Sequence, residues 1–582
     1  MLKSWLNGTV ALGMALLASG CAVAAEPVQG NTSPTPMKMP ANPAAAQADW
    51  WKKAVFYEVY PRSFADSDND GVGDLKGIAG RIDYLRDLGI DAIWLTPMFP
   101  SPQVDFGYDV SDFKDVDPQY GTLADLDRLI ALGKQNGVKL VLDLVINHTS
   151  DQHEWFKQAS SARDNPYRDF YIWRDGKAGG PPNNWTSQFG GPAWTGNSKA
   201  GQYYYHMYTP EQPDLNLRNP KVEAAMFDIV RWWFDKGVYG FRLDAVDSMF
   251  EREDLKDNPE LPGKDEYGMP RQERINNYRL PEVHTQLQRL RGQVVDRYPG
   301  RVLIGETYAE TGKDIARYYG PRNDEIQMPM FLSLIRAKPF AASSLRERIE
   351  AVENNPVGGW PTFALDNHDN IRAASRLTPP GHDPDDIAKL TGALLLTLRG
   401  TPILYYGQEI GMLNNDPKRV EDVQDPIGRK GWPQEKGRDG ERTPMQWDAS
   451  VNAGFNRGAK PWLPVGDDYR TRNVAAQTSD PSSVLSWYRQ LIALRRTHPA
   501  FLGDFISVDR TNPSVLAFLR SSPEATVLVL LNLSDKPATV GLAAVEAVRI
   551  TKPLAVNGAS ASGSEVSLKP FGAYVAEIAR RK

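Results

Sequence analysis

The chain has 582 residues, of which 41% are hydrophobic and 24% charged, and its formal net charge at pH 7 is -5. This balance is typical of a globular protein, and it gives no reason to expect nucleic acid or an anionic membrane surface as a partner. The length exceeds one ordinary domain and predicts two or three. The chain has 1 cysteine, which excludes an internal disulfide.

Residues 1–25 have the pattern of an export signal, with Lys3 before an apolar stretch too short to span a bilayer. Two processing interpretations stay open. Ala-Ser-Gly-Cys at 18–21 is similar to a bacterial lipoprotein box, which would end the signal at Gly20 and lipidate Cys21; the small residues at 22–25 fit ordinary signal cleavage. Residues 26–48 are rich in Pro, Ala, Asn and Thr and predict a disordered linker. We expect export to the periplasm, or an outer-membrane lipoprotein of a bacterium, with no membrane-spanning segment.

Apolar runs alternate with helical patterns through most of the chain. Residues 55–60, 90–95 and 138–145 predict buried strands, and residues 75–88 and 123–136 predict the helices between them. This rhythm indicates a parallel sheet, and the length favours a closed (β/α)8 barrel over an open one.

The rhythm breaks twice. Residues 149–216 are too long for an ordinary barrel loop and predict an inserted domain after the third strand. The barrel therefore comprises residues 49–148 and 217–498, and it ends with a helix at 482–496. Short strands and turns follow in residues 499–582, which predict a C-terminal antiparallel β-sandwich.

Three acids stand at the ends of predicted barrel strands. Asp244 ends Gly-Phe-Arg-Leu-Asp, Glu306 follows Leu-Ile-Gly, and Asp369 ends Asp-Asn-His-Asp. The carboxyl ends of all the strands open onto one face of such a barrel, and catalytic groups gather at that face. Three carboxylates that converge there are suited to breaking a glycosidic bond.

Five ordered motifs extend this interpretation from about Trp51 to the C-terminus. Asp-Leu-Val-Ile-Asn-His at 143–148, the runs that contain Asp244, Glu306 and Asp369, and Gln-Pro-Asp-Leu-Asn at 212–216 together resemble the α-amylase family of glycoside hydrolases (family 13). Within that family they are similar to the α-glucosidase and oligo-1,6-glucosidase branch.

The resemblance implies a role for each acid. Asp244 would be the nucleophile of a retaining hydrolysis, Glu306 the acid/base, and Asp369 the residue that binds ring hydroxyls and stabilises the cationic transition state. Arg242, two residues before Asp244, would keep Asp244 ionised. His148 and His368 would donate hydrogen bonds to sugar hydroxyls.

The same resemblance implies a closed pocket rather than a groove. Asp105 and Tyr108 would close and floor the site of the terminal glucose, and an arginine from a late loop would pair with Asp105. Arg438 and Arg442 are both candidates. Ala245, directly after the nucleophile, would favour α-1,4 over α-1,6 linkages.

An acidic turn follows the first predicted strand. Carboxylates alternate around a glycine, and the run is similar to the calcium loop of this branch; the ligands would be the side chains of Asp66, Asp68, Asp70 and Asp74 and the Val72 carbonyl. The calcium ion would be structural, and hydrolysis would need no metal.

We therefore expect an exo-acting α-glucosidase that takes short maltooligosaccharides and sucrose, with some transfer. One alternative is an isomerase of the same family, similar to trehalose synthase, because sequence does not tell how well a pocket excludes water. A second is a non-catalytic partner subunit; the presence of all three acids argues against it.

Overall fold

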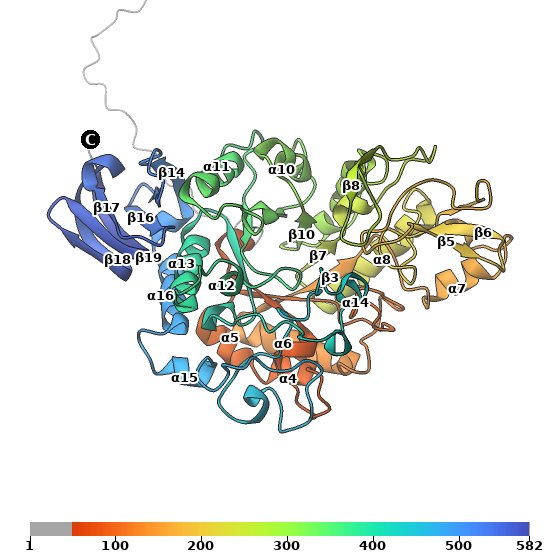
Figure 1. Ribbon diagram of the computed structural model, residues 1–582, viewed down its shortest axis with the longest axis horizontal. Coiled ribbons are helices and arrows are strands. Elements are labelled where there is room, and N and C mark those ends of the chain that lie inside the picture. The colour runs from red at the N-terminus through yellow and green to blue at the C-terminus, as the bar shows by residue number, and fades with distance from the viewer. Residues whose placement is uncertain (1–48, 581–582) are drawn as a thin grey trace, which may run out of the picture. The chain divides into compact units, whose positions relative to one another are not determined.

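Eight parallel strands close into a barrel in the computed structural model, which describes residues 49–580 (Figure 1). The strands follow chain order around the barrel, as βαβ connections dictate. They are β1 (Phe56–Val59), β2 (Ala92–Leu95), β3 (Lys139–Val145), β7 (Gly240–Asp244), β10 (Val302–Thr307), β11 (Met328–Phe331), β12 (Thr362–Ala364) and β13 (Thr401–Tyr405). The predicted signal, linker and Cys21 lie outside the described residues.

Helices surround this barrel, and their local sequence explains where several begin and end. Helix α6 spans Leu123–Asn136 as predicted, because Thr122 and Asp125 form a capping box and Gly137 ends the helix in the left-handed conformation. The helix predicted at 75–88 is instead two, α4 (Leu75–Ala79) and α5 (Ile82–Leu88), which separate at Gly80, a poor helix former. The other barrel-side helices are α2 (Trp50–Lys53), α3 (Pro61–Phe64), α8 (Pro220–Lys236), α9 (Glu282–Gln293), α10 (Gly312–Tyr319), α11 (Ala342–Glu353), α12 (Ala373–Arg376), α13 (Pro384–Thr397), α14 (Pro426–Gly431), α15 (Val474–Thr478) and α16 (Val484–Thr497).

Two insertions extend the loops at the carboxyl ends of the strands. Between β3 and α8, helix α7 (Glu154–Ser161) precedes a three-stranded antiparallel sheet of β4 (Trp173–Arg174), β6 (Gln202–Tyr205) and β5 (Trp194–Asn197). A second insertion, the hairpin of β8 (Glu260–Lys264) and β9 (Pro270–Gln272), follows β7 and was not predicted. The first insertion precedes β7, which carries Asp244, and the hairpin lies between β7 and β10, which carries Glu306. Both insertions are therefore placed to form walls of a site.

The C-terminal part is an antiparallel sheet in the order β14 (Asp504–Val508), β15 (Val515–Ser521), β16 (Thr526–Asn532), β19 (Glu565–Arg580) and β17 (Ala538–Gly541), with β18 (Ala547–Ser562) paired to β19. The two halves of β19 pair with different strands, β17 and β16, and an apolar core lies against the sheet. The predicted fold class, a (β/α)8 barrel with an inserted domain and a C-terminal antiparallel β domain, is confirmed. Within residues 49–580 no helix is both long and apolar enough to cross a bilayer.

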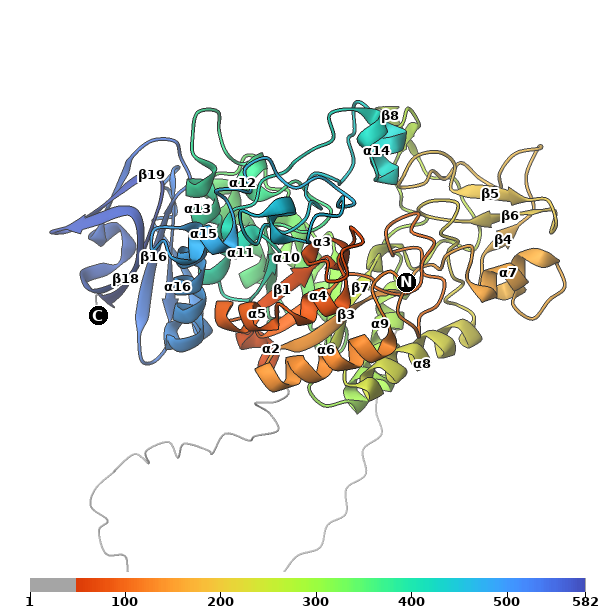
Figure 2. The same ribbon diagram turned by 90° about the horizontal axis from the view of Figure 1, so that it is seen from below.

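Strands β16, β18 and β19 of this sheet lie beside helices α13 and α16 (Figure 2). Arg520 on β15 ties the sheet to the barrel. Its guanidinium is fully buried and donates to the carbonyls of Thr397 at 2.8 Å, Phe501 at 2.6 Å and Gly503 at 2.9 Å. Thr397 ends α13, and the other two carbonyls lie in the connection to the sheet. One side chain therefore satisfies three buried backbone acceptors where the two parts meet.

Replacing Arg520 should be costly. Arg520→Met keeps the apolar bulk but leaves buried carbonyls without donors, so we expect a loss of at least about 2 kcal/mol of unfolding free energy and a lower midpoint of thermal unfolding. Arg510→Met is the matched control, because Arg510 is exposed and pairs with Glu350 at the surface, and surface pairs contribute about 0–1 kcal/mol. Equal stability of the two variants would contradict this account.

Candidate active site

The carboxyl ends of the barrel strands open into a pocket of about 850 Å³. The three acids singled out in the sequence all line it: Asp244 ends β7, Glu306 lies on the adjacent β10, and Asp369 follows β12. Phe189 and Tyr208 of the inserted domain form part of the wall. The pocket therefore combines groups from four separate parts of the chain.

Arg242 lies under the acids and contacts three carboxylates. Its Nη1 is 2.5 Å from Asp244 Oδ1 and 3.1 Å from Asp143 Oδ1, and its Nη2 is 3.1 Å from Glu306 Oε2. The arginine is 1% exposed and Asp143, opposite it on β3, is fully buried. A single guanidinium thus fixes the nucleophile and acid/base candidates relative to each other.

The pKa values of Asp244 and Asp369 are shifted in opposite directions. Burial raises the pKa of Asp244 well above its ordinary value, the Arg242 charge opposes this, and the Glu306 charge adds to it. The predicted role of Arg242, to keep Asp244 ionised, matches the direction of its charge, which lowers the pKa of Asp244 while burial acts the other way. Burial also acts to raise the pKa of Asp369, but the interactions with His368, Arg438 and Arg442 bring it below its ordinary value.

Glu306 is held from two sides. One oxygen accepts the Ala245 N–H at 3.1 Å, and the other accepts the Tyr308 hydroxyl at 2.7 Å. Ala245 itself is 5% exposed and adopts the left-handed conformation (φ 54°). Its strained backbone aims its N–H at the acid, so Ala245 contributes more than a small side chain to the pocket wall.

Arg438 closes one end of the pocket. Of the two candidate arginines it is the one that pairs with Asp105, at 2.7 Å, and it also lies 3.0 Å from Asp369 Oδ1. Arg442 instead contacts the same oxygen, Asp369 Oδ1, at 3.0 Å, and donates to the His368 carbonyl. The fully buried Asp425 holds Arg438 through Nε and Nη2, both at 2.9 Å.

The remaining predicted residues also meet in this pocket. The Tyr108 hydroxyl is 2.8 Å from His368 Nε2. His148 Nε2 is 3.1 Å from the Tyr108 carbonyl, and burial lowers the pKa of His148 to about 3, so its ring is neutral. Gln212, from the Gln-Pro-Asp-Leu-Asn motif, donates to Asp105 at 3.3 Å.

Sequence reasoning missed four polar residues that orient the others: Glu58, Asp143, Tyr308 and Asp425. Asp143 stood inside a quoted motif, and an acidic residue, Glu58, within an apolar strand run was a visible signal. Asp425 precedes Pro426, the pattern of a helix N-cap, which is where it lies. Tyr308 gave no signal beyond its closeness to Glu306 in the chain.

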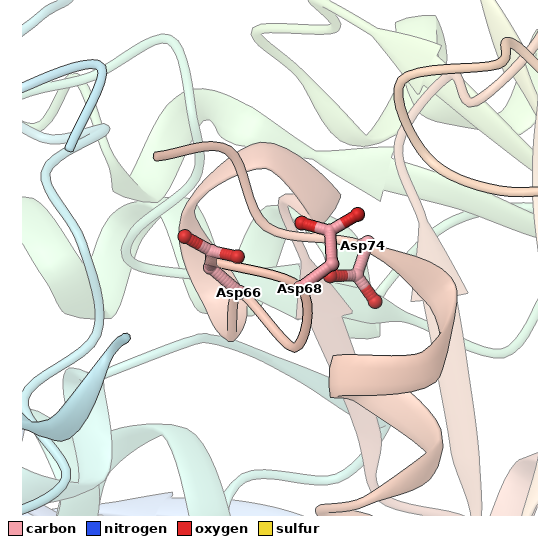
Figure 3. A group of neighbouring side chains, drawn as sticks. All are labelled: Asp66, Asp68 and Asp74. Atoms are coloured by element: carbon pink, nitrogen blue, oxygen red, sulfur yellow. The ribbon is translucent and has the colours of Figure 1, made fainter. Parts of the chain in front are cut away.

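The acidic turn lies outside the pocket, between β1 and α4. Figure 3 shows Asp66, Asp68 and Asp74 turned toward one another, and one oxygen of each lies within 4.8 Å of the others. Burial and the neighbouring carboxylates raise the pKa of Asp68. Asp70 is not in this group and accepts the Val72 N–H at 2.7 Å. Gly71 (φ 102°) lets the turn approach the Lys460 carbonyl, where a Cβ would clash.

This donor set fits a hard cation. Carboxylate oxygens crowded within a few ångströms repel one another and are the ligands that Ca²⁺ takes. The structure brings three of the five predicted ligands together; Val72 lies half-buried in the same turn. Among residues 49–580 this is the one group of three or more such side chains close enough to share an ion.

A closed (β/α)8 barrel whose polar pocket gathers carboxylates on one guanidinium is suited to the hydrolysis of a glycosidic bond. Comparison with known proteins identifies the family. The α-amylase catalytic domain matches residues 58–504 and the maltogenic amylase C-terminal domain matches residues 505–575. The chain belongs to the α-amylase family, in the α-glucosidase and oligo-1,6-glucosidase branch.

The relatives cover nearly the whole chain. The chain is 37% identical to an oligo-1,6-glucosidase of Parageobacillus thermoglucosidasius over 91% of its own length and 99% of that protein. It is 39% identical to an α-glucosidase of Culex pipiens, over 91% of each. Among solved structures, the α-glucosyl transfer enzyme XgtA is 40% identical (TM-score 0.85, 91% of this chain, 99% of that one), and the trehalulose synthase MutB of Pseudomonas mesoacidophila is 37% identical (TM-score 0.84, 91% and 100%).

The buried pair of Asp425 and Arg438 predicts a loss of stability in acid. Arg438 lowers the pKa of Asp425 to about 2 against its burial; the unfolded value is about 3.9. The ionised Asp425 therefore contributes on the order of 2 kcal/mol to the free energy of unfolding. This contribution is present above the pKa of the unfolded state and is lost as the pH falls toward the pKa of the folded state.

Asp425→Asn should therefore destabilise the protein most at neutral pH. Urea unfolding of the wild type and the variant, from pH 7 down to pH 3, should give a difference in unfolding free energy that shrinks below about pH 4. The exposed Asp422 supplies the control variant Asp422→Asn. A difference that does not change with pH would contradict the assignment.

Proposed function

We propose that this protein is a retaining, exo-acting α-glucosidase that releases glucose from the non-reducing end of short α-1,4-linked maltooligosaccharides. The observation that carries the proposal is the contact of Arg242 with both Asp244 and Glu306 in one pocket. Two carboxyl groups on one guanidinium lie close together, as a direct attack by one of them on the sugar requires.

The proposed reaction has two steps. Asp244 attacks the anomeric carbon while Glu306 gives its proton to the glycosidic oxygen, so the aglycone leaves and a glycosyl-enzyme forms. Glu306, now ionised, takes a proton from water, and the water oxygen displaces Asp244. Arg242 compensates the charge that moves between the two acids, and Asp369 stabilises the cationic ring.

The proposal of exo action rests on the closed end of the pocket. Arg438 spans Asp105 and Asp369, so the chain of a bound oligosaccharide would extend in one direction only. Preference for the α-1,4 linkage is supported by Ala245, a small side chain that lines the pocket directly after Asp244. Sucrose is a further candidate substrate on the same grounds.

Transfer in place of hydrolysis is the second candidate function. The similarity to solved structures described as an α-glucosyl transfer enzyme and a trehalulose synthase favours it. In such a reaction a sugar hydroxyl, rather than water, would displace Asp244. Some transglycosylation is therefore part of the proposal, and the identity of the products separates hydrolysis from transfer.

Product analysis tests the proposed function directly. Protein from residue 49 onward, incubated with maltose, isomaltose, sucrose and trehalose, should release glucose from maltose well ahead of isomaltose. Asp244→Asn should lower kcat by at least about 10⁴-fold, because no other group takes its role. Asp254→Asn, an exposed acid after the same strand, is the control and should keep full activity. Accumulation of an isomeric disaccharide would favour transfer, and no product from any sugar would refute the proposal.

We also propose that the acidic turn binds Ca²⁺ through Asp66, Asp68, Asp70, Asp74 and the Val72 carbonyl as a structural ion. A ligand at about 100 times its Kd adds about 2.7 kcal/mol to folding, so Ca²⁺ should raise the midpoint of thermal unfolding by several degrees and a chelator should reverse this. Asp68→Asn should lose the increase while it folds normally, because Asp68 is exposed. The control is Asp83→Asn. An equal Ca²⁺ effect on Asp68→Asn and wild type would count against the site.

A further inference from the structure

Glu58 is a buried acid that the retaining reaction leaves without a role. It lies on β1 among apolar neighbours and is 0% exposed. Its Oε1 lies 2.6 Å from Nδ1 of His368 and accepts the His368 backbone N–H at 3.2 Å. Its Oε2 has no hydrogen-bond partner among the described residues. Glu58 thus holds both the ring and the backbone of the residue that precedes Asp369.

The other ring nitrogen of His368 faces the pocket floor. Nε2 is 2.8 Å from the Tyr108 hydroxyl and 3.4 Å from Asp369 Oδ2. The Tyr108 hydroxyl has its own acceptor in Asp143, at 3.1 Å. With the tyrosine proton directed to Asp143, both oxygens near Nε2 are acceptors, so the geometry favours a proton on Nε2.

If Nε2 carries the proton of a neutral ring, Nδ1 is an acceptor and Glu58 must be its donor. Two observations agree with a protonated Glu58. An ionised carboxylate would leave the buried Oε2 with a share of charge and no donor, which is costly, whereas a neutral acid leaves only an unpaired carbonyl. Burial also raises the pKa of Glu58 and lowers that of His368, so both partners tend to be neutral.

The surroundings of the ring fit this state. Three guanidinium groups, those of Arg242, Arg438 and Arg442, oppose a positive charge on His368. Asp369 favours such a charge but already pairs with Arg438 and Arg442. A neutral ring whose Nε2–H points toward Asp369 interacts favourably with that carboxylate and adds no further buried positive charge.

We propose that Glu58 is a positioning residue, a neutral carboxylic acid that donates to Nδ1 of His368 and so holds the ring with its Nε2–H directed at Tyr108, Asp369 and the hydroxyls of the bound sugar. The assignment rests on the proposed function for its effect on rate. Its structural part, the protonation of His368, stands independently of any activity.

Three variants separate this role from mere packing. Glu58→Gln keeps a donor, the side-chain amide, for Nδ1, whereas Glu58→Leu removes it. In metal sites, loss of a residue that orients a histidine lowers metal affinity or activity about 10–100-fold. Glu58→Leu should therefore lower kcat on maltose by a similar factor, with KM changed less than about threefold. Glu58→Gln should stay within about threefold of wild type.

Glu409→Leu is the matched control for the loss of a buried acid. Glu409 is also 0% exposed, also has one oxygen without a partner, and accepts two hydroxyls, from Tyr57 at 2.8 Å and Tyr84 at 2.6 Å. It does not line the pocket. Glu58→Leu and Glu409→Leu should both unfold at lower temperature, but Glu409→Leu should keep its kcat.

Histidine NMR tests the proton directly. The chain has 7 histidines, so ¹⁵N-histidine labelling gives few signals, and His368→Gln identifies those of His368. At pH 7 the wild type and Glu58→Gln should both show a protonated Nε2 and an unprotonated Nδ1.

Each result decides the proposal. A proton on Nδ1 of the wild type would overturn it, and so would a kcat of Glu58→Leu equal to that of Glu58→Gln. Equal kcat values overturn it in either case: two fast variants would leave Glu58 without a role in the rate, and two equally slow variants would show that an amide donor does not replace the acid. If the wild type does not act on maltose, the proposed function fails and the NMR result alone decides the role of Glu58.

Discussion

The placement of one guanidinium inside the barrel is the constraint on which the site depends. Arg242 is almost fully buried, and an isolated buried charge is so costly that the surrounding carboxylates are obligatory. Asp143, Asp244 and Glu306 supply them from three neighbouring strands. The electrostatic requirement of the fold and the geometry needed for chemistry are therefore met by the same contacts.

A second layer of arginines repeats this arrangement at the closed end of the pocket. Arg438 and Arg442 both contact Asp369, and Arg438 also binds Asp105 and the buried Asp425. These segments lie far apart in the chain, so the shape of the pocket depends on the loops after the strands being held in register by charge. Such a rigid polar pocket can complement a transition state better than a flexible one.

Much of this could be predicted from the sequence because its signals are local. Helix α6 has its capping box and final glycine at its own two ends, and Asp244 and Glu306 lie at the ends of apolar strand runs. The choice of Arg438 over Arg442 as partner of Asp105 could not be predicted, because it depends on how a long loop returns to the pocket. Glu58 and His368 are 310 residues apart, so their contact exists only once the barrel closes.

The configuration of the first product tests the central claim, that Asp244 attacks the sugar directly, most simply. Glucose released from maltose can be followed by proton NMR before the free sugar equilibrates between its anomers. Two successive displacements at the same carbon predict that α-glucose appears first. Release of β-glucose would mean a single displacement by water, and it would contradict the roles assigned to Asp244 and Glu306.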